Sequence, residues 1–270
     1  MNRIRIDAVS YLNTKPLVYG LDQYSDEFDL VYDLPSRLAD SLSVDELDVG
    51  LIPVIEAISN PTYTVVSDAC IACRGPVLSV KLFGRVPPES IKTLALDEGS
   101  RTSAALSRII LKQQFSVEPE LEKLPINRPW RDSKSDEVLV IGDRAIKGFE
   151  PDNHEFEFVW DLGEYWNQWT GLPFVFAVWA ARPGVGLERI ENVLNAARDS
   201  GLGALDEICN SYRGMYDMEF DQCHQYLAES LHFKLGQQEK AGLELYFRYL
   251  KNQSIIPKEL DLTFHDCPTT

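Results

Sequence analysis

The side chains that could do chemistry in this sequence are mostly hydroxyls and amides, and they gather where apolar runs end. The run Ile4 to Val9 is followed by a first group, which consists of Ser10, Tyr11, Asn13 and Thr14. The run "TLALD" is followed by a second group, which includes Ser100, Arg101, Thr102 and Ser103. Such side chains hold and polarise a ligand through hydrogen bonds. The first group contains no His, Asp or Glu, so it offers no obvious acid or base.

Further polar or small residues continue this pattern along the chain. Pro53 ends "DVGLIP", Ser79 is a lone hydroxyl in "PVLSVKL", and Gly142 and Asp143 follow "EVLVI". Thr170 and Gly171 precede the apolar run Phe174–Ala181. Ligands of α/β proteins bind beyond the carboxyl ends of the strands, so we expect these residues to gather at one site.

The stretch "SRTS" is the best candidate for an anion site. A helix that begins there offers free backbone N–H groups and three hydroxyls, and Arg101 could make a bidentate contact with a carboxylate. Alternatives remain open: Ser100 could only cap the helix, and Arg101 could be a solvated charge. Ser79 could bond only to the backbone of its strand, and Asp143 could be either a helix cap or a catalytic base.

Composition limits the partners of this protein. The chain has 270 residues and a formal net charge of −16. That charge argues against a nucleic acid partner and against binding to an anionic membrane surface. The N-terminal stretch lacks the apolar run of a signal peptide, and no run is long enough to span a membrane. We therefore expect a cytoplasmic protein whose partner is a small molecule.

The cysteines do not indicate a metal or redox centre. There are five, an odd and scattered number that is typical of reduced thiols in a cytoplasm. Cys70 and Cys73 form a CxxC, but no second pair follows at zinc spacing. We interpret them as small buried residues, with a metal or redox role as the weaker alternative, and expect no metal and no cofactor.

The elements that position these residues form an α/β pattern in two units. Strand-like and helix-like segments alternate up to about residue 85, and they alternate again after the break "VPPES". The segments between the units are long and β-rich, and amphipathic helices follow Leu187. The pattern predicts a two-lobed α/β fold, with residues 1–85 and 182–270 in lobe 1, residues 86–181 in lobe 2, and the active site in the cleft between them.

Six motifs then resemble the chorismate dehydratase family of menaquinone biosynthesis, in the family's own order. They are "AVSYLNTKPL", "DVGLIPV", "GPVLSVKL", "LDEGSRTSAALSRIIL", "LVIGDRA" and "WTGLPFVFAVW". The resemblance implies a periplasmic-binding-protein-like (type II, Venus-flytrap) fold with two crossover segments, used by a cytoplasmic lyase without a cofactor. The implied reaction converts chorismate to 3-[(1-carboxyvinyl)oxy]benzoate and water, the first step of the futalosine route.

The implied reaction suggests a role for each of these residues. Asn13 and Ser79 are the expected catalytic residues, with Asn13 nearest the reacting atoms. The "SRTS" residues are expected to hold a carboxylate of the substrate. Because the motifs offer no strong base, we expect the enolpyruvyl carboxylate of the substrate to take the proton. Asp143 remains the competing candidate for the base.

Two alternatives to this function stay open. One is a non-catalytic binder or sensor of a small aromatic or dicarboxylate anion. The other is the related dihydroxynaphthoate synthase of the same pathway, which carries a "SPCPNDTF"-like motif that is absent here.

Overall fold

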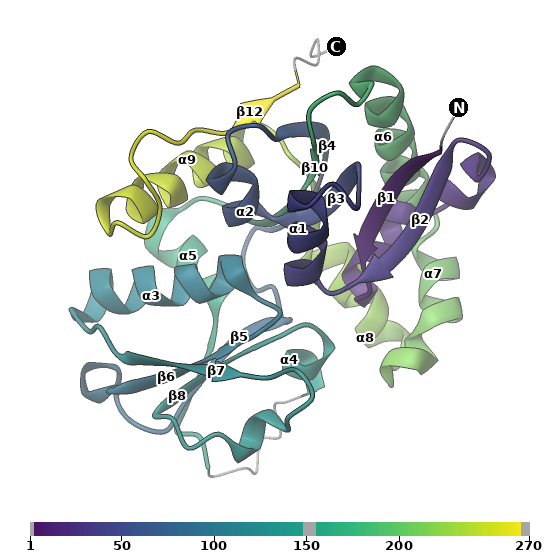
Figure 1. The fold of residues 1–270 in the computed structure, drawn as a ribbon. Coiled ribbons are helices and arrows are strands. Elements are labelled where there is room, and N and C mark those ends of the chain that lie inside the picture. The colour runs from purple at the N-terminus through teal and green to yellow at the C-terminus, as the bar shows by residue number, and fades with distance from the viewer. Residues whose placement is uncertain (1–2, 148–154, 266–270) are drawn as a thin grey trace.

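The computed structural model describes residues 3–147 and 155–265, and these form two lobes, each built on one sheet (Figure 1). The first sheet has the order β11-β4-β10-β3-β1-β2, with β12 also on β4. Its strands are β1 (Ile4–Val9), β2 (Phe28–Asp33), β3 (Val49–Pro53), β4 (Thr64–Cys73), β10 (Phe174–Ala181), β11 (His232–Lys234) and β12 (Thr263–Phe264). The α/β two-lobed architecture predicted from the sequence is confirmed.

The second sheet has the order β7-β6-β8-β5-β9. Its strands are β5 (Val80–Gly84), β6 (Thr93–Asp97), β7 (Glu120–Leu124), β8 (Glu137–Ile141) and β9 (Phe158–Asp161). In each lobe three strands run parallel: β1, β2 and β3 in the first, and β6, β7 and β8 in the second. The carboxyl ends of each parallel set therefore meet at one edge of its sheet.

The chain changes sheet earlier than the predicted boundaries at residues 85/86 and 181/182. Strand β5, expected in lobe 1, pairs with β8 and β9 of the second sheet. Strand β10, expected in lobe 2, pairs with β3 and β4 of the first sheet. The crossings are thus the segments 74–79 and 171–173. The sequence is apolar both before and after each crossing. Composition alone therefore does not show where the chain leaves one sheet and enters the other.

Helices cover both sheets. Lobe 1 carries α1 (Pro35–Ser43), α2 (Val54–Ser59), α6 (Leu187–Gly203), α7 (Leu205–Tyr212), α8 (Phe220–Gln225) and α9 (Gln237–Asn252). Lobe 2 carries α3 (Arg101–Phe115), α4 (Asp143–Lys147) and α5 (Leu162–Thr170). Short 3₁₀ turns cover Leu21–Tyr24, Pro88–Ser90, Trp130–Asp132 and Arg213–Tyr216, and a π-helical turn, Tyr226–Ser230, follows α8. No helix in the described ranges is long and apolar enough to cross a membrane.

The segment after β1 is a 3₁₀ helix, η1 (Leu12–Val18). Pro16 lies inside this turn. Because proline has no N–H to donate, it interrupts α-helical hydrogen bonding and favours a short, tight turn. Helix α6 packs against η1 and β4, so a distant part of the chain holds this turn in place.

Cys70 and Cys73 are both fully buried in β4. Burial raises the pKa of each thiol, to about 12 for Cys73. The interpretation as small buried residues agrees with this placement, since a reactive thiol needs a lowered pKa. The fifth cysteine, Cys267, lies outside the described residues.

Glu137 predicts a pH dependence of stability. It is 1% exposed at the start of β8, and burial raises its pKa to about 8. Between pH 4.5 and 8 the unfolded carboxyl ionises while the folded one keeps its proton, so the free energy of unfolding falls as the pH rises. We expect the free energy of unfolding of the wild-type protein to fall by on the order of 2–5 kcal/mol between pH 5 and pH 8.5. In Glu137→Gln this fall should be absent. Urea denaturation at the two pH values measures it, and an equal loss in both proteins would contradict the assignment.

Candidate functional site

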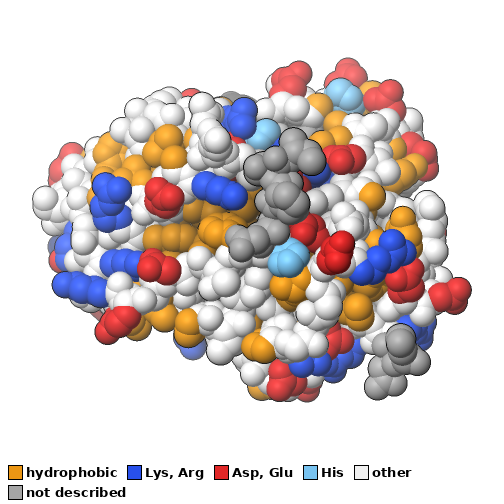
Figure 2. All heavy atoms as spheres, turned by 90° about the horizontal axis from the view of Figure 1, so that it is seen from above, with side chains coloured by type: hydrophobic (Ala, Val, Ile, Leu, Met, Phe, Trp, Pro, Cys, Tyr) orange, Lys and Arg blue, Asp and Glu red, His pale blue; other side chains and the backbone are white. Residues whose placement is uncertain are grey.

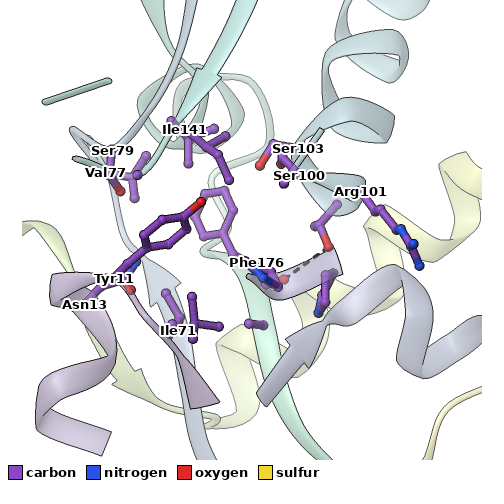
Figure 3. A pocket seen from close by; sticks show the side chains of 18 residues that line it. Tyr11, Asn13, Ile71, Val77, Ser79, Ser100, Arg101, Ser103, Ile141 and Phe176 are labelled. Atoms are coloured by element: carbon purple, nitrogen blue, oxygen red, sulfur yellow. Dashed lines mark hydrogen bonds between the residues drawn. The ribbon is translucent and has the colours of Figure 1, made fainter. Parts of the chain in front are cut away.

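A cavity lies between the lobes, beyond the carboxyl ends of β1, β3, β6 and β8 (Figure 3). It encloses about 540 Å³ of space that no protein atom fills, part of it continuous with solvent. Half of its lining is apolar: Val9, Pro35, Pro53, Ile71, Val77, Val80, Ile141, Phe176 and Ala177. Pockets of this size and polarity are typical of sites for small organic ligands.

The cavity brings together nine of the residues proposed from the sequence. They are Tyr11, Asn13, Pro53, Ser79, Ser100, Arg101, Thr102, Ser103 and Gly142. Among the described residues that line it there is no Asp, Glu, His or Lys, and Arg101 is the single charged one. The site therefore offers hydrogen bonds and apolar contact without a protein carboxylate or imidazole facing the ligand.

Five residues proposed from the sequence do not line the cavity. The carbonyl of Ser10 accepts a hydrogen bond from the Tyr216 hydroxyl, and Thr14 is fully buried. The hydroxyl of Thr170 donates to the Trp166 carbonyl within α5, and Gly171 ends that helix with a left-handed backbone. The fifth, Asp143, is described below. These residues were proposed because they lie at strand ends and crossings. Residues of the same types also occur where a helix simply begins or terminates.

Asn13 and Ser79 both line the cavity and are almost fully buried, at 8% and 2% exposed. Asn13 lies in η1, the turn that follows β1, and Ser79 directly precedes β5.

Tyr11 closes one wall of the cavity by packing across the lobes against Gly142. The backbone of Gly142 is left-handed, with a φ of +66°, and a Cβ there would lie 3.1 Å from the Tyr11 ring. Only glycine meets both conditions without strain. Gly142 therefore lets the two lobes approach each other, a role distinct from the ligand contact that we expected. Burial, reinforced by the Asp97 carboxylate, raises the pKa of Tyr11, which keeps its hydroxyl protonated.

The amino terminus of α3 faces the cavity as expected. Its residues differ in whether their side chains already make hydrogen bonds within the protein. Ser100 precedes the helix and its side chain makes no capping hydrogen bond. The Ser103 hydroxyl points toward the cavity (Figure 3). Thr102 instead donates its hydroxyl proton to the Phe176 carbonyl of the first sheet, at 3.1 Å. Ser100 and Ser103 are therefore the hydroxyls available to a ligand, and Thr102 joins the lobes.

Arg101 points away from the cavity and joins the lobes too (Figure 3). Its guanidinium lies 2.7 Å from Asp40 of α1 and 3.3 Å from Glu56 of α2. In this conformation the guanidinium, which we expected to contact a ligand carboxylate, is paired with these two protein carboxylates. Anion binding at this end of the cavity would rest on the hydroxyls and the free N–H groups of α3.

Asp143 is not among the residues that line the cavity. Burial raises its pKa to about 6, while Lys147, its own N–H, the Leu12 N–H and Lys15 lower it. Asp143 is the first residue of α4, so it lies at the helix start where the sequence offered a cap as the alternative to a catalytic base.

Two sheet lobes joined by two crossings, with a ligand-sized cavity between them, define a periplasmic-binding-protein-like fold. A Candida albicans protein, described as having the generic periplasmic binding protein fold, superposes with a TM-score of 0.62 at 15% identity, covering 99% of each chain. A family model described as menaquinone biosynthesis matches residues 4–252. The chain belongs to this menaquinone biosynthesis family.

Two curated relatives carry the same name. The chorismate dehydratase of Thermus thermophilus is 30% identical over 223 residues, which is 73% of this chain and 82% of the relative. The chorismate dehydratase of Campylobacter jejuni is 25% identical over 241 residues, or 89% of this chain and 91% of the relative. These likenesses agree with the family that the six sequence motifs resemble.

Proposed function

We propose that this protein is a chorismate dehydratase, a lyase that converts chorismate to 3-[(1-carboxyvinyl)oxy]benzoate and water in the futalosine route to menaquinone. The observation that carries the proposal is the cavity itself. It pairs Asn13 and Ser79 with the hydroxyls at the start of α3 and with apolar side chains, and none of its lining residues in the described part of the chain is acidic. The names of the two relatives support the same reaction.

The chemistry of the reaction fits this lining. Dehydration removes the C3 proton and the C4 hydroxyl of chorismate, and aromatisation of the ring supplies the driving force. The enzyme then has to hold the ring, hydrogen-bond the leaving hydroxyl and place an acceptor near C3. Ser100 and Ser103 with the α3 backbone would bind the ring carboxylate, and the apolar residues would contact the ring.

Asn13 and Ser79 would orient the C4 hydroxyl and the enolpyruvyl group at the other end. The enolpyruvyl carboxylate would then be the base that removes the C3 proton. A largely apolar, partly enclosed site favours this role. Desolvation raises the pKa of a carboxylate and so makes it a stronger base. No residue described as lining the cavity competes for the proton as an ionised carboxylate.

Incubation of the purified protein with chorismate tests the proposal. We expect the diene absorbance of chorismate to be replaced by that of an aromatic product, whose mass is lower by one water. Chromatography against authentic 3-[(1-carboxyvinyl)oxy]benzoate identifies it. Unchanged chorismate after incubation with folded protein would refute the proposed activity, and saturable binding without turnover would favour a non-catalytic binder.

A further inference from the structure

We propose that Asp161 is a positioning residue that fixes the direction of Ser79 at the wall of the cavity. Asp161 ends β9 and does not line the cavity itself. Its carboxylate binds the backbone of the turn that carries Ser79, one of the two residues expected to orient the C4 hydroxyl and the enolpyruvyl group of chorismate. The kinetic part of this inference rests on the proposed function, whereas the arrangement of the backbone does not.

The turn before Ser79 has a backbone conformation that needs outside support. Leu78 has a left-handed φ of 61°. Residues other than glycine seldom adopt this conformation, and it persists only where surrounding contacts impose it. The Ser79 N–H donates to the Val77 carbonyl at 2.7 Å, so the turn at Leu78 is tight. Val77 and Ser79 both line the cavity (Figure 3), so a relaxed turn would displace two side chains of its wall.

The Asp161 carboxylate supplies that support. Its Oδ2 accepts a hydrogen bond from the Leu78 N–H at 2.6 Å, and its Oδ1 accepts one from the Val77 N–H at 2.9 Å. Oδ1 also accepts from the N–H groups of Gly163 and Glu164, at 3.0 and 3.1 Å, which caps α5. Hydrogen bonds to a carboxylate are about twice as strong as those between neutral groups. One side chain therefore joins the strained turn to the start of a helix.

The sheet and the packing of α5 explain why this carboxylate lies beside the crossing. Strand β9 pairs antiparallel with β5, and Asp161 is opposite Lys81. The end of β9 thus meets the start of β5, where the first crossing arrives. A Cβ built at Gly163 would lie 2.5 Å from the Cys73 sulfur and 2.7 Å from the Gly75 carbonyl oxygen. The first turn of α5 is therefore packed tightly against the crossing, which holds Asp161 in place.

Asp161→Asn tests the proposal, because it alters the contact with Leu78 and can keep the others. An amide oxygen at the position of Oδ1 accepts the three N–H groups that bind there, and asparagine caps helices as well as aspartate does. The amide NH2 then replaces Oδ2 and places a donor against the Leu78 N–H. We expect kcat for chorismate to fall on the order of 10²-fold, with KM changed much less and the helix content by circular dichroism unchanged.

Asp136→Ala is the matched control, because it removes a contact of the same kind in the same lobe. Oδ2 of Asp136 accepts hydrogen bonds from the N–H groups of Lys92 and Thr93, at 2.8 and 3.0 Å, and none of the three residues lines the cavity. We expect a lower Tm and an unchanged kcat. An equal loss of kcat in both variants would contradict the proposal, because it would show that any weakening of lobe 2 lowers kcat.

A double mutant separates positioning from general stability. If Asp161 acts through Ser79, Asp161→Asn should lower kcat much less in a Ser79→Ala background than in the wild-type protein. A loss of full size in the Ser79→Ala background would overturn the proposal. So would wild-type kcat in Asp161→Asn.

The backbone of the turn provides a readout that needs no activity. In a crystal structure of Asp161→Asn we expect Leu78 to leave the left-handed region and the Ser79 hydroxyl to turn from its present direction, because the Leu78 N–H has lost its acceptor. An unmoved turn would refute the inference. A moved turn, together with a wild-type protein that leaves chorismate unchanged, would refute only the proposed function.

Discussion

Asn13→Ala is expected to lower kcat/KM for chorismate on the order of 10²–10³-fold, the usual loss when a preorganised hydrogen-bond donor is removed from an active site. Asn13 is nearly buried, lines the cavity and comes from the turn at the end of β1. Steady-state kinetics measures the loss. Binding of 3-[(1-carboxyvinyl)oxy]benzoate, followed by calorimetry, should change far less, because the hydroxyls at the start of α3 remain.

Asp143→Asn is the matched variant, because it tests the competing candidate for the base. Asp143 does not line the cavity, and asparagine keeps the size and hydrogen-bonding capacity of its side chain. We therefore expect most of the activity to persist. Removal of a true general base costs 10²-fold or more. A loss of that size in Asp143→Asn, with product binding intact, would assign the proton transfer to Asp143 and exclude the substrate carboxylate.

Gly201→Ala is expected to reduce stability strongly and to disturb the site through its packing. A Cβ at Gly201 of α6 would lie 2.0 Å from the Pro16 carbonyl oxygen and 2.7 Å from its carbon. Both atoms belong to the backbone of η1, so helix or turn must move. Overpacking of this kind costs about 1–3 kcal/mol or more. We expect a lower Tm by several degrees and a lower kcat in the protein that remains folded.

Gly203→Ala in the same helix is the control for Gly201→Ala. Nothing lies within 4 Å of a Cβ built at Gly203. Alanine favours a helix over glycine by up to about 1 kcal/mol, so this variant should be neutral or slightly stabilised. Thermal unfolding followed by circular dichroism compares the two. Equal Tm values for both variants would show that α6 and η1 are not in tight contact.

Much of the fold followed from local patterns. Alternating β-rich and amphipathic segments predicted two α/β lobes, and the ends of β1, β3, β6 and β8 do meet at the cavity. Strand ends were therefore a sound signal for Asn13 and for Ser100 and Ser103, because parallel strands bring such positions to one edge. The same signal also proposed Thr170 and Gly171. In the structure the Thr170 side chain and the left-handed Gly171 backbone instead terminate α5.

The sequence by itself determined the class of fold and most of the polar lining, because both depend on periodicity and on residue types that follow a strand. Tertiary structure alone decided which groups meet across the chain. It placed Arg101 on Asp40 and Glu56 and joined Thr102 to Phe176. These contacts connect residues far apart in sequence. Their formation depends on how the lobes and the C-terminal helices pack, which leaves no periodic or local trace in the sequence.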